Sequence, residues 1–401
     1  MTMAPSSPKL SFNDHFYSTL EKLPEGERIL ACLQCGTCSG VCPYGYLMDF
    51  PPSRMISALR AGLFDRVMKS DQVWLCVSCF ACTRSCPAKI PLTAGLMTRA
   101  KEELLLIGNV PNELQDALEN SQRYGNPLGE SPRRRASWIR GIDPPVNIMS
   151  QVGRAVDVLW FVGDYASFHP RVQLTSQALA RILNSLGIDF AILGQEEWSD
   201  GDSQRLAGER GLFEMLADKN RRAFEKYRFN KIITTDPHAY NALHNEYPAL
   251  GISYPVQHYT QFLAERLDAL RRQFRRPIKA RVTYHDPCYL GRANGIYEEP
   301  RRLLQAIPGV ELVEMSHHHE TSLCCGGGGG GMWLDGFTWE KAHIRLSEWR
   351  VREAVNVGAE ILAVACPYET PRFEDATKMV ARAGRLEVLD ISEIIAKSMS
   401  D

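Results

Sequence analysis

The chain has 401 residues, 44% of them hydrophobic and 23% charged, a composition typical of a soluble globular protein with roughly two or three domains. Its formal net charge of −1 provides no electrostatic attraction for a phosphate backbone, so we expect no nucleic-acid partner. The start, MTMAPSSPKL, is too polar for a signal peptide, and no apolar run approaches the ~18 residues of a membrane span.

Twelve cysteines are many for a chain of this size. Without an export signal a disulfide framework is not expected, which leaves metal ligation or thiol chemistry in a cytoplasmic protein. Eight of the cysteines lie between Cys32 and Cys86 and four between Cys288 and Cys366, with none in the intervening segment. This distribution predicts two metal-binding regions separated by a spacer.

The N-terminal region has the periodicity of helices. Apolar residues recur at three- and four-residue spacing in residues 12–23, 51–68 and 91–108. We therefore expect a small all-α domain over residues 1–123.

Two copies of the spacing C-x2-C-x2-C-x3-C-P lie within this domain. It is the spacing of bacterial ferredoxins, which bind [4Fe–4S] clusters and whose fourth cysteine ligates the other cluster. Three thiolates in a tight loop can bind three irons, whereas the fourth iron faces away and needs a ligand from elsewhere. We therefore predict cluster 1 at Cys32, Cys35, Cys38 and Cys86, and cluster 2 at Cys76, Cys79, Cys82 and Cys42. The alternative, a pair of zinc sites, would use pairs of cysteines separated by long spacers.

Residues 124–153 are rich in proline, arginine and glycine and are predicted to be a linker. Within them, the basic stretch PRRRASWIR at 132–140 is interpreted as a solvated segment. Docking of this stretch onto an acidic partner or a membrane surface is the alternative.

The rest of the chain alternates between strands and helices. Short apolar segments at 156–162, 190–194 and 231–235 are separated by amphipathic helical patterns at 172–185 and 203–227, which indicates an α/β domain with a parallel sheet. The same order then recurs, because ARVTYHDPC is similar to VDVLWFVGD and EILAVACPYET to KIITTDPHAYN. We predict an internal duplication with one half at 154–277 and the other at 278–401.

In this duplication only the second half retains thiols. The matched positions are Cys288 with Asp164, Cys324 and Cys325 with Ser199 and Asp200, Cys366 with Asp236, and Glu369 with Ala239. We therefore expect no cluster in the first half. Capping or turn roles are predicted for Asp164, Asp236 and His238, with a groove or a partner surface as the alternative.

The four C-terminal cysteines lie where strands are expected to end, at the edge where α/β sheets place ligand sites. The glycine run Gly326–Gly331 allows close approach of the backbone and offers N–H groups to anionic sulfur. A strained disulfide between neighbours, ordinary buried cysteines and a flexible glycine linker are the alternatives. The candidate ligands of a third cluster are Cys288, Cys324, Cys325 and Cys366.

Histidines near these cysteines are further candidates. His285 and Asp286 precede Cys288 and are expected near the cluster sulfur. The run His317–His319 is predicted to lie in a surface strand or turn, with a position near Cys324 as the alternative. No glycine-rich nucleotide motif follows a predicted strand, so we expect neither nucleotide nor flavin.

The segments CLQCGTCSGVCP and CVSCFACTRSCP resemble the α-helical ferredoxin domains of heterodisulfide reductase small subunits and succinate dehydrogenase iron–sulfur proteins. The CCG motif at 324–326 resembles the cysteine-rich domain of the heterodisulfide reductase catalytic subunit, and residues 25–400 resemble the fused form of the two. This resemblance implies a third [4Fe–4S] cluster, cubane or non-cubane. The family pattern ends in C-P-x-C, where this chain has Glu369, which either supplies an oxygen ligand or is solvated.

The resemblance implies an iron–sulfur electron-transfer subunit of a heterodisulfide reductase-like oxidoreductase complex. Electrons would pass between a soluble donor, such as a flavoprotein, and a quinone-linked membrane partner, with the chain in the cytoplasm or held at the inner face of the membrane by partners. The alternative function is that of a disulfide or thiol oxidoreductase with the third cluster as its catalytic site. A zinc-binding scaffold is a third class.

Overall fold

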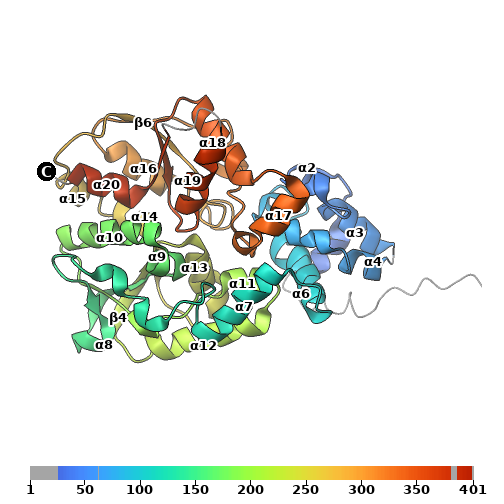
Figure 1. Cartoon of the computed structure of the whole chain (residues 1–401), viewed down its shortest axis with the longest axis horizontal. Coiled ribbons are helices and arrows are strands. Elements are labelled where there is room, and N and C mark those ends of the chain that lie inside the picture. Colours follow the sequence, from blue (N-terminus) through green and yellow to red (C-terminus); the bar gives the residue numbers. More distant parts are fainter. Residues whose placement is uncertain (1–25, 62, 381–385, 400–401) are drawn as a thin grey trace, which may run out of the picture. The chain divides into compact units, whose positions relative to one another are not determined.

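The computed structural model describes residues 26–61, 63–380 and 386–399 (Figure 1). The chain forms two compact units, Met1–Asn109 and Val110–Asp401. The helix predicted at 12–23 lies outside the described residues. Among the described helices, none combines the length and the apolar character needed to cross a membrane.

The described residues of the first unit form helices and loops. Proline is favourable at the start of a helix because its φ is fixed and the first N–H has no helical partner, and Pro52 occupies this place in α3. The predicted helical segments 51–68 and 91–108 are both helical, each in two pieces. The elements are η1 (Gly26–Ala31), α2 (Thr37–Gly40), η2 (Gly45–Leu47), α3 (Pro52–Arg60), α4 (Phe64–Met68), η3 (Asp71–Leu75), α5 (Ala81–Arg84), the π-helical η4 (Leu92–Met97) and α6 (Thr98–Leu106).

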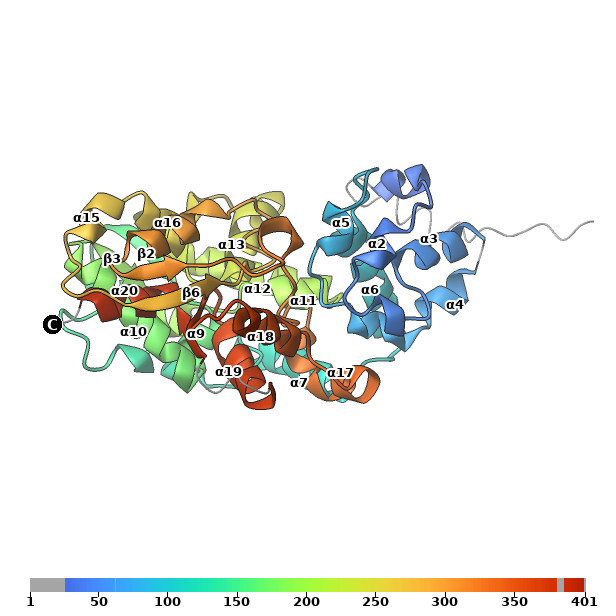
Figure 2. The same ribbon diagram turned by 90° about the horizontal axis from the view of Figure 1, so that it is seen from above.

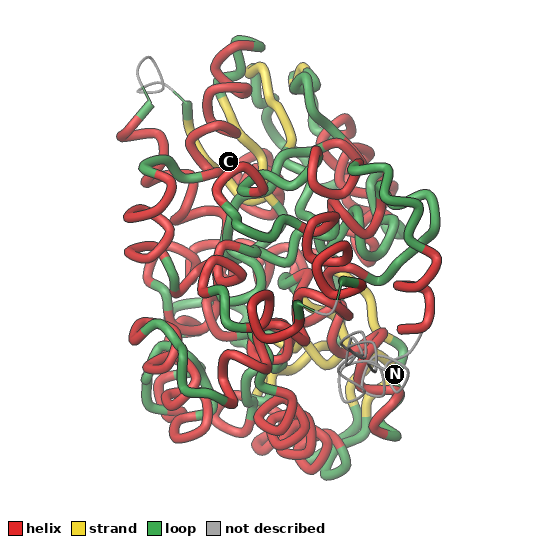
Figure 3. The backbone as a smooth tube through the Cα atoms, turned by 90° about the vertical axis from the view of Figure 1, so that its right-hand side faces the viewer, coloured by secondary structure: helices red, strands yellow, loops and turns green. Residues whose placement is uncertain are grey.

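The second unit contains two separate parallel sheets, which Figure 3 shows as two groups of strands. The first has the order β1-β3-β2-β4-β5 and the second the order β7-β6-β8-β9. The strands are β1 (Asn147–Ile148), β2 (Val156–Phe161), β3 (Phe190–Ile192), β4 (Phe229–Thr234), β5 (Val256–His258), β6 (Ala280–Tyr284), β7 (Val310–Leu312), β8 (Ile361–Val364) and β9 (Glu387–Asp390). Apart from the edge strand β1, the two orders are the same, which confirms the predicted duplication.

Helices connect the strands in both halves. They are α7 (Asn112–Tyr124), α8 (Met149–Val152), α9 (Asp164–Phe168), α10 (Pro170–Ser185), α11 (Asp202–Leu206), α12 (Arg210–Phe224), α13 (Pro237–Asn241), α14 (Tyr259–Ala264), α15 (Leu267–Arg271), α16 (Glu298–Ala306), α17 (Asp335–Ala342), α18 (Leu346–Asn356), α19 (Glu369–Met379) and α20 (Ile391–Met399). The helix predicted at 203–227 is divided into α11 and α12, with Gly208 at a φ of 100° between them.

One hydrophobic core is shared by the two halves. Helix α10 of the first half packs against α20 of the second (Figure 1), and α14 packs against α16. The core includes Leu179 and Phe262 from the first half, and Leu303 and Ile394 from the second. Within the second half, α18 and α19 also pack together (Figure 2). The halves therefore form a single compact unit.

The structure differs from the predicted linker at 124–153. Helix α7 already belongs to the second unit, and β1 adds an edge strand to the first sheet. Trp138 is buried with its ring 5.2 Å from that of Trp160 in β2, and Arg135 is buried as well. The composition of this segment suggested solvation, but its buried side chains have partners that lie much further along the sequence.

Candidate functional site

Two cavities in the first unit are lined by thiols. The first thiol cavity contains Cys32, Cys35, Cys38 and Cys86, and the second thiol cavity contains Cys42, Cys76, Cys79 and Cys82. Each cavity therefore combines three cysteines of one run with the last cysteine of the other run. Four thiol donors are the set that a [4Fe–4S] cluster requires, so the residues present fit this cofactor.

Both runs have the same local backbone. Gln34 and Gly36 in the first run, and Ser78 and Phe80 at the equivalent positions of the second, have positive φ values. Left-handed conformations are unfavourable for residues other than glycine, particularly for a bulky one such as phenylalanine. The short helices α2 and α5 begin directly afterwards and carry the third cysteine of each run.

The second thiol cavity is strongly unfavourable for bare thiolates. Burial, together with the neighbouring thiolates of Cys76 and Cys79, raises the pKa of Cys82 to about 12. Burial likewise raises the pKa of Cys42. Bound iron would reverse this effect, because a coordinating cation stabilises the deprotonated thiol.

A buried lysine supports the same cavity. Lys101 in α6 donates from Nζ to the Cys76 carbonyl oxygen at 2.7 Å, and burial lowers its pKa. The sequence prediction missed this residue. A lysine among the apolar positions of the 91–108 helical pattern was the available signal.

The third thiol site consists of Cys288, Cys324, Cys325 and Cys366, all of them buried. Cys288 follows β6 and Cys366 follows β8, and these strands are paired neighbours in the second sheet, with Tyr284 opposite Ala363. Because parallel strands end at the same edge, the sheet delivers both cysteines to one place. The segment with the vicinal pair and the glycine run supplies the other two thiols.

The glycine run has the expected close approach to sulfur. The Gly326 N–H donates to Cys324 Sγ at 3.2 Å, and the φ of Gly326 is 85°. A Cβ added at Gly327 would lie 3.6 Å from Cys325 Sγ. The positive φ explains why glycine is needed directly after the vicinal cysteines.

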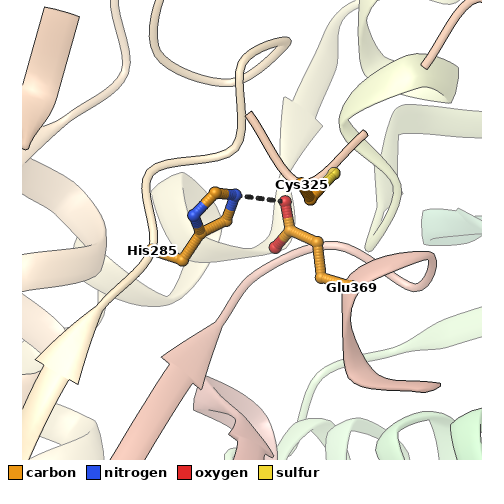
Figure 4. Close-up of side chains that lie close together, drawn as sticks. All are labelled: His285, Cys325 and Glu369. Carbon is orange, nitrogen blue, oxygen red and sulfur yellow. Dashed lines mark ion pairs between the residues drawn. The ribbon is translucent and has the colours of Figure 1, made fainter. Parts of the chain in front are cut away.

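His285, Cys325 and Glu369 converge beside this site (Figure 4), with their ligand atoms within 4.8 Å of one another. His285 Nε2 lies 3.1 Å from Glu369 Oε1. Glu369 is 1% exposed at the start of α19, so of its two predicted roles, oxygen ligand or solvated side chain, the second is wrong. Burial raises the pKa of Glu369 to about 7, although the neighbouring His285 lowers it.

The thiols of the third site differ in acidity. A hydrogen bond with Cys324 lowers the pKa of Cys325 well below its usual value, against the effect of burial, and His285 and Arg372 lower it further. By contrast, burial raises the pKa of Cys366 well above its usual value, and the carboxylate of Glu369 adds to this effect. Of these two thiols, Cys325 is therefore the more easily held as a thiolate.

Two arginines that sequence reasoning missed support the third thiol site. Arg350 in α18 donates from Nε to His285 Nδ1 at 3.0 Å. Arg372 in α19 donates from Nε to the Cys325 carbonyl oxygen at 2.8 Å. Arg372 lies three residues after Glu369, a spacing that places both on one helical face, and this was the available signal.

The other polar candidates lie away from the thiols. Asp286 forms a two-pronged ion pair with Arg301, at 2.7 and 2.9 Å, instead of facing the third thiol site. His317 is half exposed and pairs with Glu353. The run His317–His319 leads into a short surface 3-10 turn, η10 (His319–Thr321), in accord with the prediction of a surface turn.

In the first half an arginine occupies the sheet edge that corresponds to the thiol site. Asp164 follows β2, and Arg135 lies 2.8 Å from its Oδ1 and 3.1 Å from Glu197 Oε1. All three side chains are at most 2% exposed. The two carboxylates thus share one positive charge, which comes from the segment that was predicted to be a linker.

The other acidic and histidine candidates of the first half have structural partners. Asp236 caps α13 by accepting the His238 N–H at 2.8 Å, which is the predicted capping role. His238 Nδ1 lies 2.8 Å from Asp202 Oδ2, and the His238 ring lies 3.9 Å from that of Tyr289 in the second half.

Comparison with protein families agrees with this architecture. A 4Fe-4S dicluster domain matches residues 31–91, and a cysteine-rich domain, CCG, matches twice, at residues 158–244 and 282–368. The two matches of the cysteine-rich domain correspond to the two sheets. The matched dicluster domain contains all eight cysteines of the thiol cavities.

Several known proteins are similar over most of this chain. A probable iron-sulfur-binding oxidoreductase of Bacillus subtilis, FadF, is 35% identical over 88% of this chain and 49% of its own length. The EtfAB:quinone oxidoreductase of Syntrophomonas wolfei is 34% identical over 86% of this chain and 49% of its own length. The chain therefore spans about half the length of these two relatives. One subunit of the dihydromethanophenazine:CoB–CoM heterodisulfide reductase of Methanosarcina barkeri is 31% identical over 92% of this chain and 93% of its own length. With a dicluster domain followed by two cysteine-rich domains, the chain belongs to the family of iron–sulfur proteins that includes this heterodisulfide reductase polypeptide.

Proposed function

We propose that this chain is an iron–sulfur electron-transfer subunit of a heterodisulfide reductase-like oxidoreductase complex. The observation that carries the proposal is the pair of thiol cavities, each lined by four cysteines drawn from both runs. In the proposal, cluster 1 is held by Cys32, Cys35, Cys38 and Cys86, and cluster 2 by Cys42, Cys76, Cys79 and Cys82. When bound, these [4Fe–4S] clusters supply one-electron transfer, and the protein holds the thiols and excludes water.

A third [4Fe–4S] cluster completes the proposal, held by Cys288, Cys324, Cys325 and Cys366. Four buried thiols are sufficient ligands for a four-iron cluster. A hydrogen bond with Cys324, and to a smaller extent His285 and Arg372, lower the pKa of Cys325, which supports binding of iron at this site.

The partners proposed are a soluble donor, such as a flavoprotein, and a quinone-linked membrane protein. The name of the Syntrophomonas relative, a quinone oxidoreductase, supports a quinone-linked partner. We propose that the chain acts in the cytoplasm or is held at the inner face of the membrane by these partners.

The test is an anaerobic assay of the purified chain loaded with iron and sulfide. We expect about twelve irons per chain, as three four-iron clusters. With reduced methyl viologen as donor and a water-soluble quinone as acceptor, we expect catalytic electron transfer. Turnover with the CoM–CoB heterodisulfide in place of the quinone would instead favour the disulfide oxidoreductase. Zinc in place of iron and acid-labile sulfide would contradict both functions.

Cluster 1 is expected to be lost before cluster 2 when a chelator is added. Cys35 of the first thiol cavity is exposed, whereas each of the four cysteines of the second is partly or fully buried. Iron in the more open cavity is more accessible to water and to a chelator. Time-resolved EPR during anaerobic chelation of the reduced protein measures the order, and earlier loss of cluster 2 would contradict this prediction.

A further inference from the structure

One oxygen of the Glu369 carboxylate has a partner, His285, and the other has none within the described part of the chain. Its Oε1 lies 3.1 Å from His285 Nε2. Its Oε2 is buried and has no hydrogen-bond partner among the described residues. An unsatisfied buried oxygen is unfavourable, and more so when the group is charged, unless a ligand satisfies it.

The other ring nitrogen of His285, Nδ1, accepts a hydrogen bond from Arg350. Arg350 donates to Nδ1, so this nitrogen carries the lone pair and the ring proton is on Nε2, which faces Glu369. The ring therefore faces the carboxylate with its Nε2, which lies 3.1 Å from Oε1. Metal-binding carboxylates are commonly positioned by such partners.

The carboxylate lies close to Cys325, one of the thiols of the third site. Three possible ligand atoms lie within 4.8 Å of one another: a carboxylate oxygen of Glu369, the sulfur of Cys325 and a ring nitrogen of His285. The Glu369 N–H also donates to the Cys366 carbonyl oxygen at 3.0 Å, so a tight turn joins the carboxylate to a second thiol. The carboxylate is thus placed beside Cys325, one of the four proposed thiol ligands, and one of its oxygens still lacks a partner among the residues that the structure describes.

We propose that Glu369 is an oxygen ligand of one iron in the third cluster and that His285 is the positioning residue for this ligand. The cluster then has five protein donors, four thiolates and one carboxylate. This inference rests on the third cluster of the proposed function. Because carboxylate oxygen is a harder donor than thiolate and suits iron–sulfur clusters less well, the iron that it binds is distinct from the others and is the one most readily released.

The test uses the full chain loaded with 57Fe and compares Mössbauer spectra of the wild type and Glu369→Cys. We expect the wild type to contain one iron in about twelve with the higher isomer shift of mixed sulfur and oxygen coordination. Glu369→Cys should convert this iron to all-sulfur coordination and slow its release to a chelator. Glu369→Ala should remove the signal of mixed sulfur and oxygen coordination, while the four thiolates keep the cluster at four irons.

Two comparisons separate ligation from a merely structural role. Glu374→Gln, on the same helix but paired with Arg171 near the surface, should leave the spectrum unchanged. His285→Gln should keep the oxygen-bound iron and speed its release, because the ligand remains but is less well oriented. A wild-type spectrum without an oxygen-bound iron, at full iron content, would overturn the inference alone, whereas about eight irons per chain would overturn the third cluster itself.

Discussion

Replacing Cys86 with serine is expected to remove about four of the roughly twelve irons and to abolish cluster 1, although Cys86 belongs to the second cysteine run. In the structure this thiol lines the first thiol cavity together with Cys32, Cys35 and Cys38. Its loss leaves three thiols, and serine oxygen is a poor ligand for an iron–sulfur cluster. Iron and acid-labile sulfide analysis, with EPR of the reduced protein, measures the outcome.

Double variants distinguish the crossed arrangement, in which each cluster uses cysteines of both runs, from one in which each run holds its own cluster. Cys38→Ser combined with Cys86→Ser affects one cavity only, so about eight irons should remain. Cys82→Ser combined with Cys86→Ser affects both cavities, so only about four should remain. If each run instead held its own cluster, the two results would be exchanged. Cys288→Ser is the control, since it should leave both ferredoxin-type clusters in place.

Replacing Arg135 with methionine is expected to destabilise the second unit by about 3–5 kcal/mol, because it leaves two buried carboxylates without their cation. Arg135 contacts Asp164 and Glu197, whose side chains are each 1% exposed. Chemical denaturation, followed by the fluorescence of the buried Trp138 and Trp160, measures the change.

The neighbouring arginine provides a matched control. Arg134 is 64% exposed and pairs with Glu130, so Arg134→Met should change the free energy of unfolding by no more than about 1 kcal/mol. Adding Asp164→Asn and Glu197→Gln to Arg135→Met should recover part of the lost stability. Equal effects of the Arg134 and Arg135 variants would contradict the assigned role of the buried ion pairs.

The sequence was sufficient to predict those features that local patterns encode. Central strands such as β2 and β8 were predicted because they are continuous apolar runs, and cysteine spacing indicated the membership of both thiol cavities. The edge strand β1 was missed because two residues, Asn147 and Ile148, carry no periodicity. Its pairing with β3 depends on residues more than forty positions away.

Two side chains show why the rest of the site could not be predicted. Arg135 lies in a basic, proline-containing stretch, and such stretches are usually solvated, but its partners are 29 and 62 residues away in the sequence. For Glu369 both solvation and ligation were open, because nothing local indicates burial. The side chain that orients it, His285, precedes it by many residues and meets it only because β6 and β8 are neighbours in the sheet.

The buried guanidinium of Arg135 also bears on how the protein matures in the cell. An arginine is present as soon as the chain is synthesised, whereas an iron–sulfur cluster has to be delivered. The first half can therefore place a positive charge at the acidic edge of its sheet without any cofactor. Since the halves share one hydrophobic core, the stability that these ion pairs give the first half also supports the second half, whether or not a cofactor is bound.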